Sequence, residues 1–187
     1  MTQFFSKQLR ILLATNSLIL VSVAMLGPIY ALFVKKVGGD LLDASYAFAA
    51  FALAAGFTTL VSGRYSDKIK ESELIVVLGY LIMGTGFFAY IFVDSIKTLL
   101  LVQILIGLGE AIYAPAFDSV YSKHLNGHRS GYQWGAWESI NYFTSALGAV
   151  LGGYVAIKLG FETMFFFMSI LCSVSAIYIL LLPRKVL

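Results

Sequence analysis

Two glutamates interrupt long apolar stretches of this chain at a depth where a carboxyl group could take up and release protons. Glu110 lies within the apolar run 98–121 and Glu138 within the run 131–157. If each run is a helix crossing a bilayer, Glu110 lies roughly 16 Å and Glu138 roughly 11 Å from one end of its helix. A charged carboxylate is costly at such depths, and no lysine or arginine lies equally deep.

Two interpretations of these acids stay open. One or both are protonated at rest and exchange protons as part of a function, or each is a neutral or hydrogen-bonded acid that only packs. Other polar side chains recur at helical spacing with them and are predicted to share their faces. The predicted pathway set is Asn16, Tyr30, Gln103, Glu110, Tyr113, Glu138, Asn141 and Tyr142.

The elements that must position these residues are apolar helices. Hydrophobic residues make up 59% of the chain and charged residues 12%, and the mean hydropathy is +0.86, which excludes an ordinary soluble domain. Runs of about 20 apolar residues are long enough to cross a bilayer. We predict an all-α membrane protein with a single domain over residues 1–187, whose spans are about 10–33, 44–62, 73–93, 98–121, 131–157 and 160–182.

The distribution of basic residues predicts the orientation. With the N-terminus inside the cell, the inner segments hold nine of the 13 lysines and arginines and the outer segments hold four. Positive residues favour the cytoplasmic side. We therefore expect a multi-pass protein of the cell (inner) membrane with both termini in the cytoplasm, whose partner is the lipid bilayer and not nucleic acid.

The sequence offers no set of residues for catalysis or for a resident cofactor. Cys172 is the only cysteine, so no disulfide framework exists. His124 and His128 have a metal-like spacing, but Asn126 and Gly127 between them break a helix, and a solvated loop is the favoured interpretation. The sequence has no phosphate-binding loop of the Gly-x-x-x-x-Gly-Lys-Ser/Thr type. We expect no enzyme, no metal and no cofactor.

Three short motifs follow one another in order along the chain. The loop after the second run reads Gly63-Arg64-Tyr65-Ser66-Asp67-Lys68. The fourth run contains Gln103-x-x-x-Gly107-x-Gly109 and later Pro115 and Asp118. The fifth ends with Gly148-Ala149-Val150-Leu151-Gly152-Gly153.

Together these motifs resemble those of the major facilitator superfamily of transporters, over essentially the whole chain. Two departures matter: Gln103 stands where the family pattern has an arginine, and Ala149 stands where the antiporter element has a proline. Antiport is therefore not supported, and symport is the form of coupling expected.

The resemblance implies a fold and roles for several residues. It implies one half bundle of the family, with six transmembrane helices arranged as an inverted three-plus-three repeat. A shift of 87 residues places Pro28 on Pro115, although evenly spaced helices can also match by coincidence. The implied cytoplasmic latch is Gly63, Arg64, Asp67, Lys68 and Asp118. The residues expected at kinks or close helix packing are Gly27, Pro28, Gly107, Pro115, Gly148 and Gly152.

Members of the family normally have twelve spans and this chain has six apolar runs. A second copy of the chain is the expected partner, so that a homodimer transports a small solute by alternating access. The alternatives are a non-transporting membrane interaction protein, a fragment that needs a separate second half, and a small channel. The absence of a deep cation favours neutral or cationic solutes over anions, and the solute itself is unknown.

Overall fold

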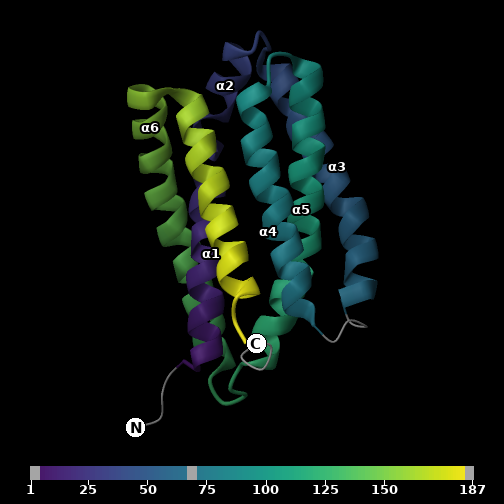
Figure 1. Cartoon of the computed structure of the whole chain (residues 1–187), viewed down its shortest axis with the longest axis vertical. Helices are drawn as coiled ribbons and strands as arrows, with labels where there is room; N and C mark the ends of the chain where they lie inside the picture. The colour runs from purple at the N-terminus through teal and green to yellow at the C-terminus, as the bar shows by residue number, and fades with distance from the viewer. Residues whose placement is uncertain (1–4, 67–70, 184–187) are drawn as a thin grey trace.

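The computed structural model describes residues 5–66 and 71–183, and the backbone within them is helical with no strand. Five helices are long and apolar enough to cross a membrane (Figure 1). The first is interrupted, with α1 at Lys7–Leu26, a 3-10 turn at Gly27–Ile29 and α2 at Tyr30–Lys36. The others are α3 (Leu41–Ser66), α4 (Ser72–Ala89, extended by a 3-10 turn at Tyr90–Phe92), α5 (Ile96–Lys123) and α6 (Ser130–Leu180).

The fifth and sixth predicted spans lie together in α6. This element is 51 residues long, and its backbone leaves helical geometry at Gly160, where φ is 87° and ψ is 164°. The chain reverses direction there, so α6 consists of two arms, before and after Gly160 (Figure 1). Glycine accepts this positive φ without the steric penalty of a side chain. The apolar runs 131–157 and 160–182 are thus joined without an intervening loop.

Short polar side chains set the starts of three helices. The Ser6 hydroxyl accepts a hydrogen bond from the Leu9 amide at 3.2 Å at the start of α1. Asp40 accepts from the Asp43 amide at 2.9 Å, while the Asp43 carboxylate accepts from the Asp40 amide at 2.9 Å. Ser95 and Thr98 form a similar reciprocal cap before α5. Such caps satisfy amides that have no partner within the helix.

The helix α4 lies at the centre of the bundle and packs against α5 and the second arm of α6. Glycines make this close approach possible. A Cβ on Gly79 would lie 2.5 Å from the Tyr113 Cβ and 2.7 Å from the Gly109 carbonyl oxygen. On the other side of α4, a Cβ on Gly84 would lie 3.2 Å from the Cys172 Cβ. Small residues allow such contacts between helices in membranes.

A proline inside α5 creates a link to α3. Pro115 has no N–H, so the carbonyl of Ala111, four residues earlier, lacks its usual helical donor. The Ser62 hydroxyl of α3 donates a hydrogen bond to that carbonyl oxygen at 2.6 Å. A side chain of one helix therefore satisfies the backbone group that the proline leaves open in its neighbour.

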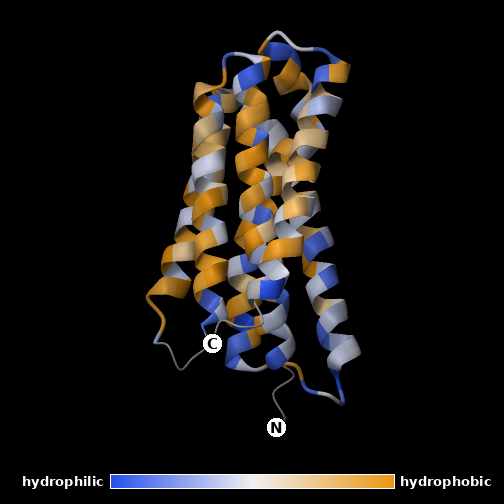
Figure 2. Ribbon diagram, turned by 90° about the vertical axis from the view of Figure 1, so that its right-hand side faces the viewer, coloured by the Kyte–Doolittle hydropathy of each residue, from blue (hydrophilic) through white to orange (hydrophobic). Residues whose placement is uncertain are grey.

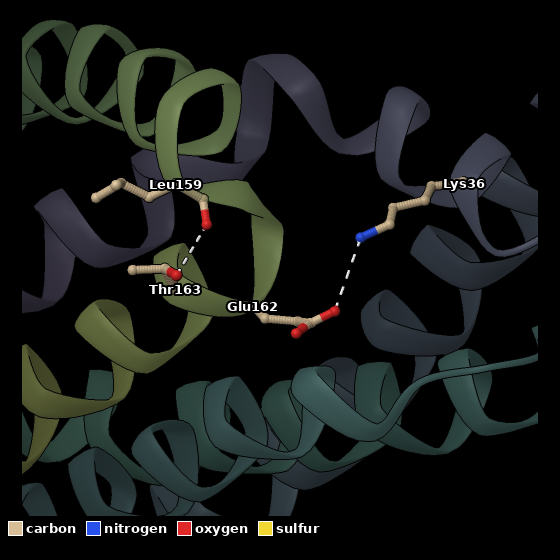
Figure 3. A network of polar contacts seen from close by, with 4 residues as sticks. All are labelled: Lys36, Leu159, Glu162 and Thr163. Atoms are coloured by element: carbon tan, nitrogen blue, oxygen red, sulfur yellow. Dashed lines mark hydrogen bonds and ion pairs between the residues drawn. The ribbon is translucent and has the colours of Figure 1, made fainter.

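The two ends of the bundle are polar and its length is apolar. Figure 2 shows hydrophobic residues along most of the helices and hydrophilic residues gathered towards the ends. The start of α1 and the end of α6 lie at the same end, which we call the terminal end (Figure 1). At the opposite end, Lys36 of α2 lies 3.9 Å from a Glu162 carboxylate oxygen, just after the reversal in α6 (Figure 3). The Lys36 ammonium also lies 5.7 Å from the centre of the Phe161 ring.

Candidate functional site

A hollow of about 260 Å³ lies between the first helix, α3 and α5, with α4 behind it. Val23 and Phe48 on its rim are exposed, so the hollow opens at the surface of the bundle. The 3-10 turn that separates α1 from α2 forms part of its wall, at the position where the sequence predicts a kink. The lining residues are Val23, Leu26, Gly27, Tyr30, Phe48, Phe51, Phe87, Tyr90, Gln103, Ile106 and Glu110.

The structure brings three of the predicted pathway residues together in this hollow. Tyr30 comes from α2, and Gln103 and Glu110 come from α5, two turns apart on one face. Glu110 is half-buried near the middle of α5, about 20 Å from either end of that helix. Within the described residues, Glu110 forms no ion pair, and the buried Tyr30 hydroxyl has no hydrogen-bond partner. Tyr30, Gln103 and Glu110 therefore form the polar part of the hollow's wall.

Most of the hollow is aromatic or aliphatic, and sequence reasoning missed these residues. Phe48 and Phe51 come from α3, Phe87 from α4 and Tyr90 from the turn that follows it. Apolar residues on an apolar helix carry no signal that separates a cavity wall from a lipid-facing surface.

Two predicted pathway residues lie in the packed core, where they contact a tyrosine of α4. The Tyr80 hydroxyl donates a hydrogen bond to the Asn16 side-chain oxygen at 3.1 Å. The Tyr80 and Tyr113 rings pack edge to face with centroids 5.0 Å apart. Asn16, Tyr80 and Tyr113 are all buried, and none of them lines the hollow. In this structure they join α1, α4 and α5.

The remaining predicted pathway residues lie on the first arm of α6, away from the hollow. Glu138 and Tyr142 are exposed, Tyr142 with 74% of its surface accessible, and Asn141 is half-buried. Glu138 lies about 12 Å from the start of α6. The first arm therefore presents a carboxyl, an amide and a phenol on the outer surface of this chain, within the part of the helix that would lie inside the membrane.

The glycines predicted at helix contacts lie where helices approach closely. A Cβ on Gly107 would lie 2.5 Å from the Phe51 carbonyl oxygen of α3. A Cβ on Gly148 would lie 2.6 Å from the Ala24 Cβ of α1, and one on Gly152 would collide with the Met25 backbone. The first arm of α6 is therefore held closely against α1 by its glycines, and its other face stays exposed.

The predicted latch is only partly described. Asp67 and Lys68 lie outside the described residues. Arg64 and Asp118 are exposed, and no ion pair joins them within the described part of the chain. A Cβ on Gly63 would meet no described atom within 4 Å. Residues 5–66 and 71–183 contain no cluster of three or more side chains suited to a metal ion.

Comparison with known proteins agrees with this architecture. Residues 12–186 match the family model described as Major Facilitator Superfamily. An uncharacterized MFS-type transporter of Methanocaldococcus jannaschii is 26% identical over 91% of this chain and 44% of its own length. A proton-coupled antiporter flippase of Staphylococcus haemolyticus is 26% identical over 84% and 40%. A quinolone resistance protein of Staphylococcus aureus is 22% identical over 96% and 47%. The chain thus spans about half the length of the curated relatives it matches.

Proposed function

This chain belongs to the Major Facilitator Superfamily, and we propose that it moves a small solute across the membrane by alternating access, as one of two facing bundles. Members of this family are transporters and not enzymes, and the apolar helices make this chain an integral membrane protein. The hollow carries the proposal. It has walls on three sides and an exposed rim, and a second bundle over the rim would complete it.

The chemistry of the hollow favours a neutral or cationic solute with apolar surface. Glu110 is the only charged side chain among its lining residues, and the other polar groups belong to Tyr30, Tyr90 and Gln103. The volume of about 260 Å³ lies just below the range of roughly 300–1,000 Å³ for small-molecule sites. A pocket shared between two bundles would reach that range.

The exposed acid on α6 is the reason to place a second bundle beside this one. A charged side chain at the bilayer centre costs about 2.5–3.5 kcal/mol, and an acid facing lipid about 12 Å inside its helix incurs part of that cost. Glu138, with Tyr142 one turn further on, is far better accommodated against another protein surface or an aqueous path. We propose that a second copy of this chain supplies that surface, with the terminal end of both copies in the cytoplasm. The two arms of α6 would be the fifth and sixth spans of the inverted repeat.

A cysteine pair across the proposed interface tests the homodimer. The variant carries Arg64→Cys and Gly135→Cys, two positions near the terminal end, with the buried Cys172 replaced by serine. In a two-fold dimer the end of α3 faces the first arm of α6 of the other copy, so oxidation in membranes is expected to give a covalent dimer. Arg64→Cys with Ile177→Cys, on the second arm, is the control expected to stay monomeric.

A chain that stays monomeric in membranes, with no covalent dimer from the first pair, contradicts the homodimer. The result would favour the alternative that this bundle needs a separate second half or serves as a non-transporting interaction protein. Co-expression with a cysteine-free copy of the chain distinguishes cross-links between copies from those within one copy.

Proton coupling is tested with matched glutamine variants in proteoliposomes. We propose that Glu110 and Glu138 exchange protons during transport, so Glu110→Gln and Glu138→Gln are each expected to reduce solute-driven proton flux to the level of empty liposomes. Glu162→Gln is the control, since Glu162 is an exposed acid paired with Lys36 at the far end. A Glu138→Gln protein with full pH-dependent uptake contradicts the role of that residue.

A further inference from the structure

A second groove lies on the opposite side of the first helix, between α1 and the second arm of α6. Its volume is about 400 Å³, and it begins at the terminal end of the bundle. None of the residues that line the transport hollow takes part in it. The lining residues are Lys7, Arg10, Ile11, Ala14, Thr15, Leu18, Val174, Ser175 and Tyr178.

Charge is concentrated at one end of this groove. Lys7 and Arg10 lie in the first turn of α1 and are exposed. No acidic residue lines the groove, and neither cation forms an ion pair within the described residues. Two cations one turn apart can reach the same phosphate group, to which an arginine can donate two parallel hydrogen bonds.

The rest of the groove is suited to a hydrocarbon chain. Ala14 and Leu18 continue the stripe of Lys7 and Arg10 along α1, and Leu18 lies about 16 Å from Lys7 along the helix axis. Val174 and Tyr178 form the opposite wall, and both are about half exposed.

The polar groups on the floor of the groove are already satisfied. The Ser175 hydroxyl donates to the Thr15 carbonyl oxygen at 2.9 Å. The Thr15 hydroxyl donates to the Ile11 carbonyl oxygen at 2.9 Å. No polar group on the floor therefore needs water, and hydrocarbon can lie there without an energetic penalty.

We propose that this groove binds one anionic phospholipid, with its phosphate paired to Lys7 and Arg10 and an acyl chain along Ala14 and Leu18. The order of the groups matches a lipid in the leaflet at the terminal end, with the headgroup at the surface and the chain towards the bilayer centre. The lipid would join α1 to the second arm of α6, on the side of the bundle away from the transport hollow. This inference does not depend on the proposed transport function.

The headgroup contact is tested by native mass spectrometry of the full chain in detergent, with phosphatidylglycerol or phosphatidylcholine of the same acyl chains. Phosphatidylglycerol is expected to bind about 10-fold more tightly, because its headgroup is a net anion that both cations attract, whereas the choline cation of phosphatidylcholine offsets its phosphate. The double variant Lys7→Gln/Arg10→Gln is expected to lose this preference. Arg64→Gln/Lys123→Gln removes two exposed cations of the terminal end outside the groove and is expected to keep it. Equal loss in both double variants would show diffuse attraction and overturn the site.

The acyl contact is tested by filling the groove. Ala14→Phe places a ring in the groove and leaves both cations in place, so phosphatidylglycerol binding is expected to fall about 10-fold, by loss of a few buried methylenes. Ala31→Phe is the matched control on an exposed position of α2 outside the groove. If Ala14→Phe binds phosphatidylglycerol as the unsubstituted chain does, or if glycerol phosphate binds equally well, the site recognises free phosphate and the lipid proposal is wrong.

Discussion

The helix α4 and the outer helices α3 and α6 (first arm) all belong to elements apolar enough to cross a membrane, yet their environments differ. Val76, Tyr80 and Met83 of α4 have no exposed surface. In α3, Phe57 is 70% exposed, and in the first arm of α6, Tyr142 and Phe143 are each 74% exposed. Hydropathy alone does not distinguish a helix packed at the centre of a bundle from one whose exposed surface contacts lipid or a second protein. The central helix differs from the outer ones in its small residues at close contacts and in its buried hydrogen bonds.

The comparison predicts a different use for glycine in the two regions. Gly79 of α4 has Tyr113 and the Gly109 backbone in the position of a Cβ, whereas Gly56 of α3 has no neighbour within 4 Å. Gly79→Ala is therefore expected to lower stability by about 1–3 kcal/mol through overpacking. Gly56→Ala is expected to raise it by up to about 1 kcal/mol through better helix propensity. Thermal unfolding in detergent measures both, and equal shifts would contradict the close packing at α4.

The exposed face of α6 is expected to matter for association and not for the stability of one copy. Tyr142→Ala is expected to weaken self-association in membranes about 10-fold, as truncation of a large interface side chain commonly does. Tyr178→Ala is the matched control, because Tyr178 is a half-exposed tyrosine on the second arm of the same element. Energy transfer between labelled copies at varied protein-to-lipid ratios measures the change. Equal association of all three proteins would show that this face is not the interface.

One hydrogen bond joins the outer helix α3 to the backbone of α5. Ser62 supplies the donor that Pro115 cannot give to the Ala111 carbonyl. Ser62→Ala leaves that carbonyl without a partner and is expected to cost about 1 kcal/mol. Faster hydrogen exchange of the α3 amides would report the loss. Ser45→Ala is the control, since the Ser45 hydroxyl bonds only to Leu41 of its own helix, and exchange as fast in that variant would contradict the link.

The smallest effect is expected at the buried polar pair of the core. Tyr80→Phe removes the donor to Asn16, and hydrogen bonds between membrane helices contribute about 0.6 kcal/mol on average. A small fall in the unfolding midpoint is expected. Tyr154→Phe, at an exposed tyrosine of α6, should leave the midpoint unchanged. A large loss of transport activity with unchanged stability in Tyr80→Phe would instead return Asn16 to the solute pathway and add Tyr80 to it.

The amino-acid sequence by itself determined the class of protein and the approximate helices. Composition excluded a soluble domain, and the apolar runs lie within the helices of the structure to within a few residues. The ordered motifs pointed to the family that the comparison shows. These properties are local or additive, because hydropathy, prolines, glycines and caps act over one helical turn or sum along one helix.

Only the tertiary structure decided which polar residues meet. Helical spacing placed Glu110 and Glu138 on faces of their own helices, but the rotation of each helix within the bundle is set by packing at glycines such as Gly79 and Gly152. Packing turned Glu110 into the hollow with Tyr30, turned Asn16 towards Tyr80, and left Glu138 on the outside of the chain. A periodic pattern fixes the relative angles of side chains on one helix, and the contacts with its neighbours fix where that helix faces.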